Sequence, residues 1–173
     1  MSNYYQLMVK EEDAFGVGRA LAPDAWLSLP MAGMVQRWEP LQLELEGGQY
    51  PDYLASDLAC RICSERLREI LQNHASPLDS LQWLEAIVSN GADARQYFVL
   101  HFPQPPDILD ARKTIFAGDF VVKAVLSKHR VNGHHVFGYP NCGQLPLFIS
   151  DQVRQAVERA HCTGMEIARV PIT

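Results

Sequence analysis

Residues 147–157 read LFISDQVRQAV, an apolar run that ends at Ser150 and continues into apolar residues at helical spacing. A serine hydroxyl can accept a hydrogen bond from a free backbone N–H group in the first turn of a helix. The acidic Asp151 that follows is favoured there by the helix dipole. The stretch therefore predicts a strand that runs directly into a helix capped by Ser150.

The same pattern occurs in residues 61–71, RICSERLREIL, where Ser64 and Glu65 take the places of Ser150 and Asp151. We therefore expect two strand-to-helix junctions, each capped by its serine, and aspartate should cap about as well as serine at either position. Two copies are too few for a solenoid, which needs about three stacked repeats.

Apolar residues recur on one helical face after each serine. The first face ends before the polar stretch 73–77, and the second ends at Thr163 and Gly164, where Gly164 is expected to close the helix in the left-handed conformation. The two faces consist of Leu67, Ile70 and Leu71, and of Val153, Ala156, Val157 and Ala160.

The N-terminal part of the chain predicts two strands. Residues 4–9, YYQLMV, are rich in β-favouring side chains, and residues 41–46, LQLELE, alternate between apolar and polar side chains. Residues 15–40 mix Gly, Pro, Trp and Met without a clean period and predict a long, partly ordered connection against the core. The outward row of the second strand would carry Gln42, Glu44 and Glu46.

Helix and strand patterns compete within residues 78–102, but Asn90-Gly91 before the β-favouring YFVLHF favours a hairpin. The prolines in residues 103–106 then interrupt the sheet. The predicted fold class is α+β, with strand-rich mixed or antiparallel sheets and two principal amphipathic helices. Further strands are expected at residues 119–126, 135–139, 145–150 and 165–172.

Composition limits the classes of function. The 173 residues, 47% of them hydrophobic, can bury a real core in one domain or in two tightly joined lobes. The net charge of −5 gives no large basic surface for direct binding of nucleic acid. There is no leader-like N-terminus and no run of about 18 apolar residues that would span a membrane. We therefore expect a cytoplasmic protein.

Catalytic motifs are weak. Cys60 and Cys63 form a CxxC pair, but the helix signal begins only at Ser64, which disfavours a redox site and favours buried, unpaired thiols. Residues 16–18, GVG, lack the third glycine of a nucleotide-binding loop. The sequence therefore predicts a protein that is not an enzyme and needs no cofactor or metal.

Two alternatives remain open from the residues alone. One is a non-catalytic oligomerisation module. The other is a metal-dependent enzyme, which would require convergence of side chains that are distant in the sequence. Its candidate residues are Asp107, Asp110, Asp119, His134 and His135.

Several segments, in this order, resemble the immunity proteins of bacterial polymorphic toxin systems, in the family numbered eleventh among them. The resemblance is strongest over residues 51–173 and thin over residues 10–49, so we expect a single domain, 1–173, with a variable N-terminal part, 1–50. Asp110 would match an aspartate that follows the family's aromatic strand. The segments are SNYYQL, RICSERLREIL, QYFVLHFPQPPDILD, FVVKAVL and HVFGYPNCGQLPLFISDQVRQAVERAHCTGMEIARV.

The resemblance implies an immunity protein that neutralises a cognate bacterial toxin by stoichiometric binding in a heteromeric complex, and a homo-oligomer is also possible. Such proteins are encoded beside a secreted or contact-delivered toxin. Toxins that act on nucleic acid often have cationic clefts, to which an acidic partner would be steered. The candidate toxin-binding residues are Glu11, Glu12, Asp13, Glu44, Glu46, Asp107 and Asp110.

Overall fold

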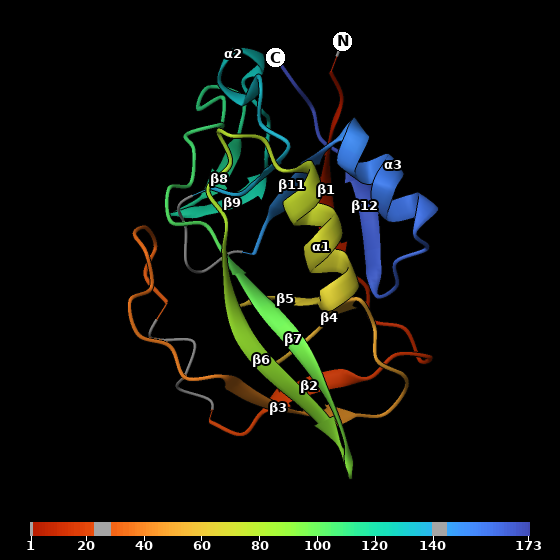
Figure 1. Cartoon of the computed structure of the whole chain (residues 1–173). Helices are drawn as coiled ribbons and strands as arrows, with labels where there is room; N and C mark the ends of the chain where they lie inside the picture. Colours follow the sequence, from red (N-terminus) through yellow and green to blue (C-terminus); the bar gives the residue numbers. More distant parts are fainter. Residues whose placement is uncertain (1, 23–28, 140–144) are drawn as a thin grey trace.

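The structure of the chain is a computed structural model that describes residues 2–22, 29–139 and 145–173 (Figure 1). Within these ranges it contains a four-stranded sheet, a six-stranded sheet, a separate two-stranded ribbon and three helices. Strands dominate, and parallel and antiparallel pairs both occur. The predicted α+β class is confirmed.

The four-stranded sheet has the order β10-β11-β1-β12, and all its pairs are antiparallel. Tyr4 of β1 lies opposite Ser150 of β11, and Tyr5 lies opposite Arg169 of β12. The first strand is therefore enclosed by segments from the far end of the sequence. The strands are β1 (Tyr4–Val9), β10 (Val136–Phe137), β11 (Leu147–Ser150) and β12 (Met165–Arg169).

The six-stranded sheet has the order β2-β3-β6-β7-β5-β4, in which β3 and β6 are parallel. The predicted hairpin is confirmed as β6 and β7, with Gly91 at a φ of 60° in its turn. The strands are β2 (Val17–Ala20), β3 (Leu41–Glu46), β4 (Tyr53–Leu54), β5 (Arg61–Ser64), β6 (Gln82–Asn90) and β7 (Asp93–His101).

Strand β2 corrects the prediction of an irregular connection over residues 15–40. It pairs with β3 although its sequence, VGRA, shows no strong alternation. A side chain at Gly18 would lie only 3.0 Å from the Leu54 side chain, so tight packing requires glycine where a strand normally carries a β-favouring residue. The position of this strand was therefore set by packing that the local sequence does not show.

The predicted boundaries of the strand at residues 119–126 also differ from the structure. The predicted strand 119–126 is shorter, β9 (Phe120–Lys123), and it pairs with β8 (Ile115–Ala117), which was not predicted. Leu126 instead forms isolated bridges with Leu109 and Ile172. The ribbon is thus a separate sheet beside the two larger ones (Figure 1).

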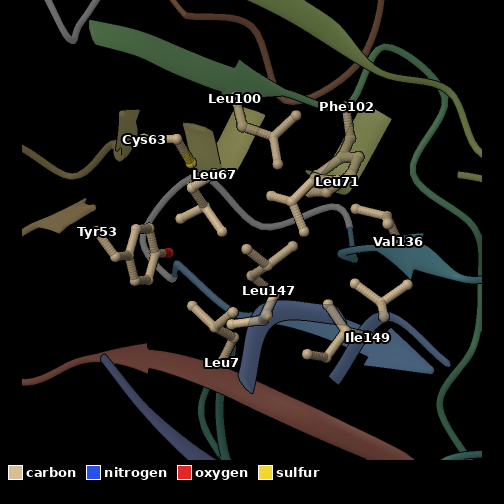
Figure 2. Close-up of a cluster of buried hydrophobic side chains, with 12 residues drawn as sticks. Leu7, Tyr53, Cys63, Leu67, Leu71, Leu100, Phe102, Val136, Leu147 and Ile149 are labelled. Carbon is tan, nitrogen blue, oxygen red and sulfur yellow. The ribbon is translucent and has the colours of Figure 1, made fainter. Parts of the chain in front are cut away.

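Both principal helices are confirmed, and they pack against each other (Figure 1). Leu67 and Leu71 share a core cluster with Leu147 and Ile149 of β11, and Figure 2 shows these side chains pointing into one apolar layer. Phe148 lies between them in the sequence and faces a different cluster on the other side of its sheet, as strand alternation requires. The helices are α1 (Glu65–His74), α2 (Lys128–Val131) and α3 (Asp151–Arg159).

The end of α3 differs from the expected glycine cap. His161 takes the left-handed conformation, with a φ of 50°, and donates its N–H to the Glu158 carbonyl, while Cys162 donates to Val157. These two bonds are those of a Schellman motif. Gly164 serves another purpose: a Cβ there would lie 2.5 Å from the Tyr53 carbonyl oxygen, so glycine permits two segments to touch.

Candidate partner-binding surface

Ser64 is a helix cap, as predicted, and it has a second role. Its hydroxyl accepts a hydrogen bond from the Leu67 N–H at 3.2 Å and donates to Asp52 at 2.7 Å. Asp52 also accepts from the Arg66 guanidinium at 2.5 Å and from the Thr163 N–H at 2.8 Å. This buried carboxylate therefore joins the start of α1 to the segment that follows α3.

The hydrogen bonds at Asp52 outweigh the effect of its burial. Burial alone would raise the pKa of this carboxyl, but the bonds from Arg66, Ser64 and Thr163 stabilise the ionised form and hold the pKa below its ordinary value of 3.8. Asp52 was not among the predicted residues, because its partners lie up to 111 residues away in the sequence.

The prediction that Ser150 caps the second helix is wrong. Ser150 occupies the position before α3, but its hydroxyl makes no capping hydrogen bond. The hydroxyl instead forms a 2.8 Å hydrogen bond with Nδ1 of His135, and the Ser150 N–H donates to the His135 carbonyl at 3.0 Å. The local sequence predicted that this hydroxyl would cap the helix. In the structure it instead bonds to His135, which directly precedes β10.

Asp79 fixes the segment that carries His135. Its side chain has no exposed surface, accepts from His134 Nδ1 at 2.8 Å, and accepts from the backbone N–H groups of His135 and Val136 at 3.0 and 2.9 Å. It also accepts from the Ser76 N–H at 2.7 Å. The two histidines are therefore held in structural networks.

The candidate metal ligands fall into separate contacts. Asp107 pairs with Arg130, whereas Asp110 accepts from the Thr173 hydroxyl at 2.7 Å. The histidines bond to Asp79 and Ser150 as described. In residues 2–22, 29–139 and 145–173, no three His, Cys, Asp or Glu side chains are grouped so that they could hold a metal ion.

The CxxC thiols lie in the core. Cys60 and Cys63 are both buried and free, as expected. Burial raises the pKa of Cys60 to about 11 and also raises that of Cys63, which keeps both thiols protonated and poorly nucleophilic at neutral pH. Cys142 lies outside the described residues.

Three of the candidate toxin-binding carboxylates come together around Arg19 of β2. Glu46 forms a 2.9 Å ion pair with Arg19, and Glu44 lies directly opposite Arg19 in the β2–β3 register. Glu46, Asp57 and Glu11 all raise the pKa of the exposed Arg19 guanidinium, with the Glu46 hydrogen bond the largest cause. We call Glu11, Glu44, Glu46 and Asp57 the acidic surface.

The other candidates lie beside this surface or apart from it. Glu12 and Asp13 follow Glu11 and are exposed, with Glu12 paired to Lys10 at 2.7 Å. Asp107 and Asp110 instead contact Arg130 and Thr173 near α2, and Asp110 is only partly exposed. Asp57 was missed because it sits in an irregular segment. Its carboxylate accepts from the Ala20 N–H of β2 at 3.0 Å, and its own N–H donates to the Gly18 carbonyl at 3.3 Å.

A groove of about 340 Å³ begins at the acidic surface. Its lining includes Val9 and Glu11 near the end of β1 and Val121 of the ribbon. The segment before β5 also lines it, with Ser56 and Leu58 among its residues. The groove therefore borders both the acidic surface and the β8–β9 ribbon.

Residues 6–170 match the model of a family described as an immunity protein family, which places the chain in the class of immunity proteins. The family is Imm11, and the chain belongs to it. The match includes residues 10–49, where the sequence resemblance was thin. No curated relative matches the chain. Among the helices that the structure describes, none has the length and apolar character needed to cross a bilayer.

Proposed function

We propose that this protein neutralises a cognate bacterial toxin in the cytoplasm by binding it in a one-to-one complex, without chemical turnover. The observation that carries the proposal is the Imm11 family match over nearly the whole chain. An immunity protein acts on a toxin, and occupancy of the toxin is the simplest means of neutralisation for a chain of this kind.

The contacts of the polar side chains support binding over metal-dependent catalysis. Asp107, Asp110 and the two histidines belong to different networks, each satisfied by a partner within the fold. A hydrolytic metal site would need such groups around a common point. Within residues 2–22, 29–139 and 145–173, the contacts of these side chains therefore do not favour the metal-dependent alternative.

The acidic surface is the proposed electrostatic contact. Glu46, Asp57 and Glu11 interact with the Arg19 guanidinium, and Glu44 lies opposite Arg19 in the strand register, so the carboxylates of this surface outnumber that guanidinium and their sum with it is negative. Such a surface attracts a cationic cleft and speeds association. Glu12 and Asp13 extend it, and Asp107 and Asp110 remain separate candidates for contact with the toxin.

Titration of toxin activity tests the proposed mechanism. The toxin domain encoded beside the immunity gene is assayed with increasing amounts of the immunity protein. Occupancy predicts that inhibition saturates near one immunity protein per toxin. Full protection at about one immunity protein per hundred toxins would mean turnover and would contradict the proposal.

Charge reversal tests the acidic surface. Glu44→Lys with Glu46→Lys should slow association with the toxin and weaken its dependence on salt, as measured by stopped-flow at several ionic strengths. Glu69→Lys on α1 is a control on another exposed surface, with the same type of charge change at a single position. Equal association rates for the double variant and the native protein would remove this surface from the interface.

A further inference from the structure

A pocket of about 590 Å³ lies between the start of β1, the end of β12 and α2. Its lining includes Asn3, Lys128, Asn132 and Arg169. Figure 1 shows α2 at the opposite end of the molecule from β2 and β3, which carry part of the acidic surface. The volume falls in the range of about 300–1,000 Å³ that is typical of pockets for small molecules. We call this hollow the α2 pocket.

Hydrogen bonds within the protein hold the walls of the α2 pocket in place. The phenol of Tyr4 donates to the Val131 carbonyl of α2 at 3.0 Å. The Lys128 N–H donates to the Thr173 carbonyl at 2.9 Å, and the Thr173 N–H donates to the Leu126 carbonyl at 3.0 Å. The segment after β12 is therefore tied to α2 and its approach. A pocket that is already formed lowers the entropy cost of binding.

Positive charge predominates in the α2 pocket. Lys128 and Arg169 line it, and the lining residues that the structure describes include no Asp or Glu. The Arg169 guanidinium is held by a 2.8 Å hydrogen bond to the side-chain carbonyl of Asn3. Asp110 is not part of the lining, and its carboxylate accepts from the Thr173 hydroxyl at 2.7 Å. A free carboxylate at Thr173 would offset one of the two cations and leave the sum positive.

Apolar side chains form another part of the α2 pocket. Tyr4, Val170, Pro171 and Ile172 all line it. Tyr4 and Val170 are buried members of the cluster that contains Phe148, and Ile172 packs partly against that cluster. The apolar wall is therefore an extension of the core. Pockets for small molecules commonly combine such walls with a few polar groups that fix the orientation of the ligand.

We propose that the α2 pocket binds a small organic anion that carries a phosphate or carboxylate group on an apolar or aromatic body. The anionic group would accept charge-assisted hydrogen bonds from Lys128 and Arg169. The body would lie against Tyr4 and Ile172, where its apolar surface leaves water. This inference goes beyond the proposed function and does not depend on it.

The extent of the α2 pocket favours a small molecule over an acidic segment of a protein. A stable protein interface takes about 20–30 residues on each partner. Ten described residues line the pocket, and they surround a single hollow. The pocket is therefore large enough for a compact ligand and too small to serve alone as a protein interface.

NMR titration of the native protein with 1-naphthyl phosphate at pH 7 tests the inference. Inorganic phosphate and 1-naphthol serve as the two halves of this probe. The backbone amides of Asn3, Asn132 and Thr173 should shift on addition of the whole probe, because these residues line the pocket. The whole probe should bind at least about tenfold more tightly than either half, since each half makes only part of the contacts.

Charge removal in the α2 pocket identifies the groups that hold the anion. Lys128→Gln and Arg169→Gln should each weaken the Kd for 1-naphthyl phosphate by about tenfold, because each removes a charge-assisted hydrogen bond. Lys123→Gln is the matched control, with the same loss of charge at an exposed position of β9, and it should change the Kd less than about twofold. The melting temperatures of all three variants should stay near that of the native protein, because these side chains are exposed.

Equal Kd values for the native protein and both pocket variants would overturn the inference, as would amide shifts confined to other parts of the protein. Binding of inorganic phosphate as tight as that of the whole probe would also contradict it, because the apolar wall would then contribute nothing. If the pocket variants weaken binding of the toxin while the native protein does not bind the probe, the pocket contacts a protein and the inference is wrong. Native protein that fails to bind the toxin would contradict the proposed function alone.

Discussion

The two serine junctions share one sequence pattern and form different hydrogen bonds. Ser64 caps α1 and also binds Asp52, whereas Ser150 precedes α3 without capping it and binds His135. Local sequence therefore sets where each helix begins. Neighbours that are distant in the sequence decide which atoms the serine hydroxyl contacts.

Each junction also depends on a buried aspartate. Asp52 binds the hydroxyl of Ser64 directly, while Asp79 holds the backbone of His135, which in turn binds Ser150. The first connection is direct and the second has an intermediate residue. Changes at the aspartates and serines can therefore separate the contribution of each connection.

Asp79→Ala should have the largest effect. It leaves the N–H groups of Ser76, His135 and Val136 without their acceptor, and the side chain it removes is fully buried. We expect a loss of about 4 kcal/mol in the free energy of unfolding, measured with urea. A loss below about 1 kcal/mol would show that water replaces the carboxylate and that the second junction does not depend on it.

Asp52→Ala should cost somewhat less, about 3 kcal/mol, because its partner Arg66 is half exposed and can be rehydrated. The cost should also depend on pH. The pKa of Asp52 is lowered in the folded protein, so its contribution is present above 3.8 and is lost as the pH falls through the lower folded value. Unfolding of both proteins measured from pH 7 down to pH 2 should show the difference shrinking in acid; a constant difference would contradict this assignment.

Replacing each serine with aspartate should affect the stability of the two junctions differently. Ser64→Asp places a second carboxylate where a hydroxyl now donates to Asp52 at 2.7 Å, and we expect a loss of about 2 kcal/mol. Ser150→Asp faces His135 Nδ1, which can donate a charge-assisted hydrogen bond to the new carboxylate, so its cost should be below about 1 kcal/mol. Thermal unfolding at pH 7 measures both, and equal losses would mean that the distant neighbours do not distinguish the junctions.

Alanine at the two serines should have the smallest effects. Ser64→Ala removes a cap and should cost about 1 kcal/mol, whereas Ser150→Ala removes one hydrogen bond to His135 and should cost about 0.5 kcal/mol. Denaturant unfolding of the two variants side by side checks the order. A larger loss at Ser150 would imply a capping role that the geometry does not show.

The sequence predicted elements with strong local patterns. Alternation identified β3, Asn90-Gly91 identified the β6–β7 hairpin, and serine followed by an acid located both helices. Strands β2 and β8 were missed because they are short and lack a clear alternation, so their pairing depends on the partner strand.

The candidate surface was predictable only in part. Glu44 and Glu46 followed from the alternation of β3, because every second residue must face away from the core. Their proximity to Glu11 and Asp57 depends on how separate segments meet at Arg19. The exposure of Phe120 and Val122 in β9 was not predicted, because an apolar strand pattern does not show whether the strand is covered by other segments.

The central place of β1 has a consequence for synthesis on the ribosome. Tyr4 pairs with Ser150, which is translated 146 residues later, so this part of the sheet cannot form before then. At a translation rate of about 5–20 residues per second, that delay is roughly 7–30 s. During this time the segment that becomes β1 has neither of its neighbouring strands, so a newly made molecule can complete its four-stranded sheet only after Arg169 of β12 has been translated.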